Sequence, residues 1–172
     1  MKMWGGRFEK GTAKSVEEFT SSISFDKRLY AEDIKVSMAH ASMLGHTGII
    51  TEDEGSEIKA GLSQILEEIE SGEFEFQETD EDIHTAIERR LIELIGPVGR
   101  KLRTARSRND QVVTDLRLFL KGEIAEVAKL AIELHETLIN RAEQDGEVVM
   151  PAYTNLQRAQ PVLLAHHLLA YF

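Results

Sequence analysis

Residues 107–144 read SRNDQVVTDLRLFLKGEIAEVAKLAIELHETLINRAEQ, and this stretch decides the fold. Apolar residues recur along it at spacings of three and four, the period of an α-helix, and Gly122 is its only helix breaker. A helix of about 38 residues is about 57 Å long, whereas the mean globular helix has about 11–12 residues. The stretch therefore predicts a bundle helix that needs long partners. Its apolar stripe comprises Val112, Leu116, Phe119, Ile124, Val127, Ala131, Leu134, Leu138 and Ala142.

Shorter helices are expected before this stretch. Apolar spacing predicts three of them, over residues 27–46, 51–71 and 80–95. Asp26 is expected to cap the first, and Thr51-Glu-Asp-Glu54 matches the capping box that would open the second. Gly96-Pro97 should end the third. The first 24 residues, rich in glycine and small polar residues, are expected to be irregular.

The end of the chain contains no helix long enough to cover the stripe. The polar run 153–161 is expected to be a loop, and a new helix should begin at Pro161 and stop mid-pattern at Phe172. The expected fold class is all-α, with a small helical domain at 1–103 and an incomplete bundle domain at 104–172. We expect the chain to be the N-terminal part of a longer protein, with a domain-swapped small protein as the alternative.

The composition excludes several classes of protein. The chain has 20 Lys and Arg against 30 Asp and Glu, a formal net charge of −10, which argues against nucleic-acid binding. It has no Cys, so disulfide scaffolds and Cys-ligated metal sites are excluded. The start, MKMWGGRFEKG, lacks the apolar run of a signal peptide, and no stretch reaches the about 20 apolar residues of a membrane span. We expect a cytoplasmic protein that has no membrane or nucleic-acid partner.

The acidic balance hides a local cluster of cations just before the long helix. Residues 100–108 contain five cations, namely Arg100, Lys101, Arg103, Arg106 and Arg108. The run Thr104-Ala-Arg-Ser-Arg-Asn-Asp-Gln111 sets two of them beside hydroxyl and amide groups at a helix N-terminus, where backbone N–H groups favour an anion. A small di- or tricarboxylate would suit this site. A solvated basic turn that caps the helix is the alternative.

Three other polar clusters each have a structural and a functional interpretation. Tyr153-Thr-Asn-Leu-Gln-Arg-Ala-Gln-Pro161 is either a donor-rich binding surface or a capping loop. In Glu81-Asp-Ile-His84, carboxylates beside an imidazole could orient a proton-transfer group, or could form an ordinary first helical turn. His166 and His167 point to different helix faces, so we interpret them as structural and expect no metal site.

Five segments are distributed over the whole chain: Met3-Trp-Gly-Gly-Arg-Phe8, Ser21-Ser-Ile-Ser-Phe-Asp26, Glu81-Asp-Ile-His-Thr-Ala86, Thr104–Gln111 and Thr154-x-Leu-Gln-Arg-Ala-Gln-Pro161. Together and in this order, they resemble the argininosuccinate lyase family, which includes the δ-crystallins. The Arg-Ser-Arg-Asn-Asp run is typical of the argininosuccinate branch of the fumarase/aspartase superfamily. Fumarase-like relatives usually have a small polar variant there.

The resemblance implies an all-α homotetramer in which long helices from four subunits form one bundle. The implied reaction is the reversible cleavage of argininosuccinate to arginine and fumarate, without a cofactor or metal. A base removes a proton from the carbon beside a carboxylate, and preorganised donors and cations stabilise the resulting dianion. An acid then assists departure of the guanidino nitrogen. In the family, each site gathers residues from three subunits.

The family's site residues carry over to matching positions of this sequence. Ser22, Arg108, Asn109 and Thr154 match substrate-binding positions, the second and third of them holding substrate carboxylate. Supporting roles are expected for Asp82, His84, Arg106 and Gln157.

Three departures from the family bear on catalysis. Asn155 stands where the family usually has a proton-transfer His, and an amide can form hydrogen bonds but cannot titrate. Arg103 stands where the family usually has another His, between Leu102 and Thr104. The family's catalytic Ser lies in a Gly-Ser-Ser-x-Met-Pro loop, and that sequence does not occur in these 172 residues. We therefore expect this chain to be inactive alone.

Three other functions remain open at this point. Asn155 favours a non-catalytic, crystallin-like homologue that binds argininosuccinate without turning it over. Another fumarate-releasing lyase of the superfamily is the second, and it would lack a guanidinium pocket for arginine. A helical interaction module is the third.

Overall fold

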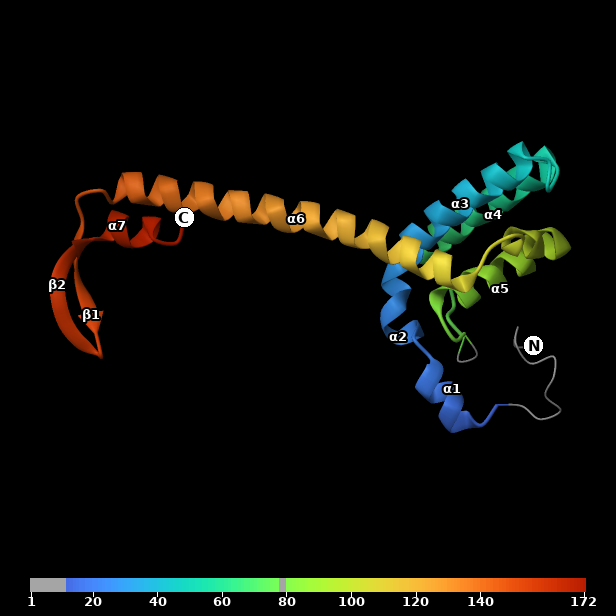
Figure 1. Ribbon diagram of the computed structural model, residues 1–172, viewed down its shortest axis with the longest axis horizontal. Coiled ribbons are helices and arrows are strands. Elements are labelled where there is room, and N and C mark those ends of the chain that lie inside the picture. Colours follow the sequence, from blue (N-terminus) through green and yellow to red (C-terminus); the bar gives the residue numbers. More distant parts are fainter. Residues whose placement is uncertain (1–11, 78–79) are drawn as a thin grey trace. The chain divides into compact units, whose positions relative to one another are not determined.

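The computed structural model describes residues 12–77 and 80–172, and most of them lie in helices (Figure 1). The expected all-α class is therefore confirmed for most of the chain. The chain divides into two compact units, the first ending at Phe119 and the second comprising Leu120–Phe172. The domain boundary between residues 103 and 104 stays a prediction. The segment Met3–Phe8 lies outside the described residues.

A helical hairpin, α3 (Tyr30–His46) with α4 (Glu52–Ser71), is the centre of the first unit (Figure 1). The predicted capping box is confirmed: the Thr51 hydroxyl accepts from the Glu54 amide at 3.2 Å, and the Glu54 carboxylate accepts from the Thr51 amide at 3.1 Å. Gly72 ends α4 in the left-handed region, with φ 79°, where a side chain would be strained. The local sequence thus sets both ends of α4.

The hydrophobic core of the first unit lies where α3, α4 and α5 (Ile83–Ile95) meet. Gly61 permits α4 to approach α5 closely, because a Cβ there would lie 2.7 Å from the Leu91 side chain. A fully buried Ile or Leu stabilises a fold by about 1.5–3 kcal/mol. The fully buried aliphatic side chains are Ile34, Leu44, Ile58, Leu62, Ile65, Ile83, Ile87 and Leu91.

The N-terminal part of this unit corrects two expectations. Two short helices, α1 (Lys14–Thr20) and α2 (Ile23–Asp26), occupy the segment expected to be irregular. A 3₁₀ turn, η1 (Lys27–Leu29), precedes α3, and Asp26 does not cap that helix. Its carboxylate instead accepts hydrogen bonds from the Ser22 hydroxyl and the Ile83 amide, so a tertiary contact replaces the local cap.

The third helix, α5, begins at Ile83 rather than at Asp80. Asp82 is its N-cap and accepts from the Thr85 amide at 2.6 Å. Asp80 is buried and receives two hydrogen bonds of 2.9 Å from the Arg89 guanidinium, which fastens the preceding loop to the helix. Gly96, with φ 64°, ends α5 as predicted, and the 3₁₀ segment η2 (Gly96–Arg103) follows.

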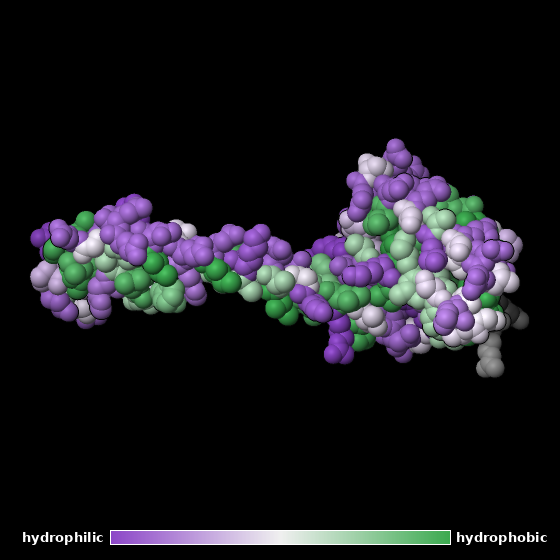
Figure 2. Space-filling model, turned by 90° about the horizontal axis from the view of Figure 1, so that it is seen from above, coloured by the Kyte–Doolittle hydropathy of each residue, from purple (hydrophilic) through white to green (hydrophobic). Residues whose placement is uncertain are grey.

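The long helix is confirmed as α6 (Arg108–Gln144), and it continues from the first unit into the second. Its apolar stripe is largely exposed along the helix, as Figure 2 illustrates with hydrophobic side chains at the surface. Leu116 is 44% exposed and Ile124 is 67% exposed, whereas Val112, Phe119 and Leu138 are half-buried. Asp115 and Ala142 are the buried residues of α6. No helix within the described ranges is long and apolar enough to cross a membrane.

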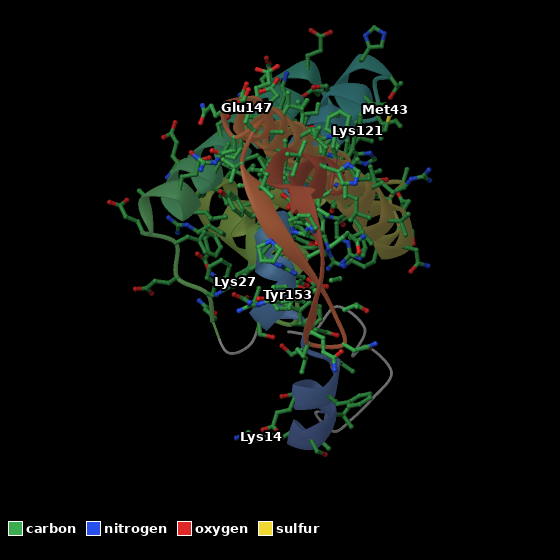
Figure 3. The ribbon with its side chains drawn as sticks, turned by 90° about the vertical axis from the view of Figure 1, so that its left-hand side faces the viewer. Lys14, Lys27, Met43, Lys121, Glu147 and Tyr153 are labelled. Carbon is green, nitrogen blue, oxygen red and sulfur yellow. The ribbon has the colours of Figure 1, made fainter. Side chains whose placement is uncertain are left out.

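The second unit corrects the expected C-terminal loop. Residues 149–163 form an antiparallel hairpin of β1 (Val149–Thr154) and β2 (Gln157–Leu163), and the last helix, α7 (Leu164–Leu169), starts after Pro161. Pro151 and Pro161 lie opposite each other, which is tolerated because both strands of a two-stranded hairpin are edges. Tyr153 projects from β1 and is 61% exposed (Figure 3).

Candidate active site

A pocket of about 320 Å³ lies in the first unit, within the size range of small-molecule sites. Three of the residues predicted from the sequence, Ser22, Asp82 and His84, line it. Its other lining residues are Phe25, Asp26, Arg28, Leu29, Val112, Leu116 and Phe119. The pocket thus combines an apolar wall from α6 with hydroxyl, carboxylate, imidazole and guanidinium groups.

Ser22 is tied to the segment that precedes α5. Its amide donates to the Glu81 carbonyl at 2.8 Å, and its hydroxyl donates to the Asp26 carboxylate at 2.5 Å. Burial raises the pKa of Asp26, although the bonds from Ser22 and Ile83 partly oppose that rise. The two sequence segments that contain Ser22 and Asp82, far apart in the chain, therefore meet at one edge of the pocket.

Arg108 lies beside Asp82 at the start of α6. Its Nε is 3.6 Å from the Asp82 carboxylate, and its Nη2 donates to the Thr85 hydroxyl at 3.3 Å. Its Nη1 donates to the Gln111 side chain at 3.4 Å. These contacts are long for charge-assisted hydrogen bonds, which are typically about 2.7–2.9 Å. The guanidinium can thus exchange them for a tighter bidentate contact with a bound carboxylate.

Arg106 and Asn109 have other hydrogen-bond partners than Arg108 has. The Arg106 Nη1 donates to the Ser37 hydroxyl at 2.9 Å, while its Nη2 is buried and has no hydrogen-bond partner among the described residues. Burial lowers the pKa of Arg106, which nearby carboxylates partly offset. Asn109 is exposed in the first turn of α6, and its amide donates to the Ser107 hydroxyl at 3.3 Å. Neither residue lines the pocket.

Two buried acids, Asp33 and Asp115, contact the Nδ1 atom of His84. Its Nδ1 lies 2.9 Å from Asp33 and 3.5 Å from Asp115, and all three side chains are at most 2% exposed. Burial lowers the pKa of His84, but the hydrogen bond and the charge of Asp33 more than offset this, so the net shift is upward. Burial and the neighbouring Asp33 raise the pKa of Asp115 to about 7.

Asp33 is the ionised member of this cluster. Burial alone would raise its pKa, but hydrogen bonds and charge from His84, together with a bond donated by Gln111, lower it overall. The ligand atoms of Asp33, His84 and Asp115 lie within 4.8 Å of one another, a spacing that a metal ion would also fit.

The predicted residues of the second unit lie at the tip of the hairpin. Thr154 pairs with Gln157, and Asn155 and Leu156 between them have φ 50° and 62°. Positive φ at both central positions is the signature of a type I′ turn, which favours Asn. Asn155 is exposed, as are its neighbours Thr154 and Gln157. These three residues belong to a unit other than that of the pocket.

Asp33 and Asp115 are not among the site residues predicted from the sequence. A signal for both was present, because each acid has apolar residues at helical spacing: Asp33 is eight residues before Ala41, and Asp115 is three residues after Val112 and four before Phe119. A carboxylate on a buried face is costly unless it is partnered or protonated. Such a position therefore indicates a tertiary partner.

The helical fold and the cation-bearing pocket agree with the class of protein that similarity to known proteins identifies, the lyases. The chain belongs to the lyase family, whose model, described as Lyase, matches residues 6–172. It is 59% identical over 171 residues to an argininosuccinate lyase from Desulforamulus reducens, and 57% identical over 171 residues to one from Symbiobacterium thermophilum. Each alignment covers 99% of this chain.

The chain spans 37% of the length of these two curated relatives. A solved structure of an EDDS lyase variant with bound fumarate is similar as well, with a TM-score of 0.70 and 27% sequence identity. That match covers 94% of this chain and 32% of the other. The fold of the lyases thus extends over nearly the whole chain.

Proposed function

We propose that this chain forms part of an argininosuccinate lyase, which cleaves argininosuccinate to arginine and fumarate. The observation that carries the proposal is the meeting of three family segments: Ser22 and Asp82 with His84 line one pocket, and Arg108 lies beside it, 3.6 Å from the Asp82 carboxylate. The identity of 57–59% to argininosuccinate lyases supports the same substrate. The fumarate named in the related EDDS lyase structure is the product that this reaction would release.

The chemistry that the pocket can perform is recognition of the succinyl half of the substrate. Arg108 would leave its long contacts with Asp82 and Thr85 and grip a carboxylate with two N–H groups. The Ser22 hydroxyl and the His84 ring, both of which line the pocket, would add hydrogen bonds. These groups stabilise negative charge that grows when the proton beside the carboxylate is removed.

The elimination itself breaks one C–H and one C–N bond. A base takes the proton from the carbon beside the carboxylate, the electron pair forms the double bond of fumarate, and the guanidino nitrogen leaves with a proton from an acid. Thr154 and Gln157 would contact substrate from the hairpin tip. Asn109 would bind the same substrate carboxylate as Arg108. No cofactor enters this scheme.

Asn155 favours a second candidate function, that of a homologue that binds argininosuccinate without turnover. An amide at the position of the family's proton-transfer His cannot deliver a proton. Its backbone is in the left-handed region, where Asn and His are both enriched, so a His would fit the same turn. Substitution at this position therefore separates the two functions without disturbing the hairpin.

We propose further that the protein acts as a homotetramer in the cytoplasm. The exposed stripe of α6 supports the oligomer, because isolated apolar surfaces of this extent are rare in monomers. Sites shared between subunits would then bring hairpin residues of one chain to the pocket of another.

A growth assay tests the proposed function. Residues 1–172 would replace the matching segment of the Desulforamulus reducens enzyme, and the chimera would be expressed in a strain that lacks argininosuccinate lyase and needs arginine. We expect the Asn155→His chimera to restore growth without arginine. Failure of that chimera, when the unaltered relative restores growth and the chimera is folded, would contradict the proposal.

A further inference from the structure

Three helices of the first unit meet behind the His84 ring. Asp33 comes from α3, His84 from α5 and Asp115 from α6, and their exposed fractions are 1%, 3% and 0%. None of the three belongs to the hydrophobic core, yet all are buried as deeply as core residues. The cluster therefore needs a physical reason to exist.

Asp115 is the residue that most needs an explanation. Both oxygens of its carboxylate are buried, and neither has a hydrogen-bond donor within the described part of the chain. A buried carboxylate without donors is costly when ionised and far less so when protonated. Asp33 is the adjacent acceptor, so a proton held between the two acids would satisfy both carboxylates.

The charges that face this acid pair agree with a shared proton. Besides His84, the guanidinium of Arg106 acts on both acids. The Gln111 side-chain amide already donates to Asp33. A metal ion bound there would stand next to the Arg106 cation and compete with that donor. The surroundings thus favour a proton over a metal ion.

The two ring nitrogens of His84 have different surroundings. Nδ1 is committed to Asp33, while His84 also lines the pocket beside Ser22 and Asp82. The nitrogen available to a ligand in the pocket is therefore Nε2. Asp26, Asp82, Glu88 and Arg108 are further charged groups near the ring and the acids. Asp82 and Arg108 act on the His84 charge, and His84 acts on Asp26.

We propose that Asp33 and Asp115 are positioning residues that hold the His84 ring by Nδ1 and present its Nε2–H to a substrate carboxylate in the pocket. The catalytic half of this inference rests on the proposed function. The orientation of the ring does not, and it can be measured on this chain directly.

Nitrogen-15 NMR of the histidine rings tests the orientation. The chain has six His, and a His84→Gln variant identifies the resonances of this ring. We expect the His84 ring to stay protonated to a higher pH than an ordinary His and to sense a second titration near the pKa of about 7 of Asp115. Asp33→Asn should lower the pKa of His84, and Asp115→Asn should remove the second titration.

Two comparisons make this experiment decisive. Asp53→Asn, an exposed acid in the first turn of α4, serves as the matched control and should leave the His84 titration unchanged. Asp115→Asn keeps a neutral side chain of the same size, so it remains informative if Asp33→Asn does not fold. An unchanged His84 titration in the acid variants, or a shift of its resonances on adding Zn²⁺ or Mn²⁺ alone, would overturn the proposal.

Kinetics of the Asn155→His chimera test the catalytic half. Loss of the partners that orient a metal-ligating His typically costs about tenfold to a hundredfold, and we expect a loss of similar size in kcat/KM for Asp33→Asn. Asp115→Asn should remove the part of the pH profile that changes near pH 7. Rates and pH profiles equal to those of Asp53→Asn would overturn the positioning role. A chimera without activity would instead refute the proposed function, and the NMR result would still stand.

Discussion

The first unit and the long helix differ in how their apolar surface is covered. Leu62 of α4 is 0% exposed within the three-helix core, whereas Leu134 of α6 is 57% exposed. Both residues belong to helical stripes of the same period. The difference teaches that the first unit contains its own core, while most of the α6 stripe is left exposed by the described residues.

The largest expected effect concerns association through that stripe. We expect the isolated chain to form oligomers, and the triple variant Ile124→Lys, Val127→Lys, Leu134→Lys to be monomeric, because three charges replace three exposed apolar side chains of the stripe. Light scattering measures the mass of both proteins. A monomeric parent chain would break the comparison, because the stripe would then be stable in water.

A matched pair of leucines gives the next largest effect. Leu62→Ala should lower the free energy of unfolding of the first unit by about 2–5 kcal/mol, since it leaves a cavity in a closed core. Leu134→Ala should change it by no more than about 0.5 kcal/mol. Hydrogen exchange of the α4 amides in increasing urea reports both values. Equal effects would show that α6 is covered as well as α4 is.

The stability of the first unit should depend on pH through Asp115. The pKa of this acid rises from 3.8 to about 7 on folding, so the folded state binds the proton more tightly than the unfolded state does. The stability gained from that proton is fully present below about pH 4 and is lost as the pH rises to about 7.

Asp115→Asn removes this dependence, because an amide does not titrate. Relative to the parent, the variant should gain more than about 1 kcal/mol between pH 4 and pH 8, since one pKa unit corresponds to about 1.4 kcal/mol. Urea unfolding at several pH values measures the difference. A constant difference across this range would show that Asp115 is ionised throughout.

The smallest expected effect tests a local signal. Thr51→Ala removes the hydroxyl that accepts from the Glu54 amide and should destabilise the first unit by about 1 kcal/mol. Thr137→Ala is a suitable control, because that hydroxyl bonds back to the Glu133 carbonyl within α6 and caps nothing. If urea unfolding gives equal losses of stability for both variants, the capping box does not explain the loss in Thr51→Ala.

The sequence predicted those elements whose formation depends on contacts between residues close together in the chain. The capping box at Thr51, the stop at Gly96 and the long helix α6 all follow from residues within one or two turns of each other. The hairpin tip did not follow, because Asn155-Leu156 is a poor turn signal without a Gly and the flanking prolines suggested a loop. The pairing of Pro151 with Pro161 is a non-local contact.

In the candidate site, too, some residues were predictable from sequence segments and others depend on tertiary contacts. The family segments pointed to Ser22, Asp82, His84 and Arg108, which do lie near one pocket. Asp26 was assigned a helix cap, but its carboxylate binds Ile83, which is 57 positions away. Asp33 and Asp115 were overlooked because their partners come from other helices, and only tertiary packing brings them to His84.

The release of fumarate from argininosuccinate by the purified chimera tests the central claim most directly. Fumarate absorbs in the ultraviolet, so its formation can be followed continuously. We expect the Asn155→His chimera to turn over argininosuccinate at a rate orders of magnitude above that of the chimera that keeps Asn155. Absence of fumarate from the Asn155→His chimera, with the unaltered relative active in the same assay, would contradict the assignment of this chain to an argininosuccinate lyase.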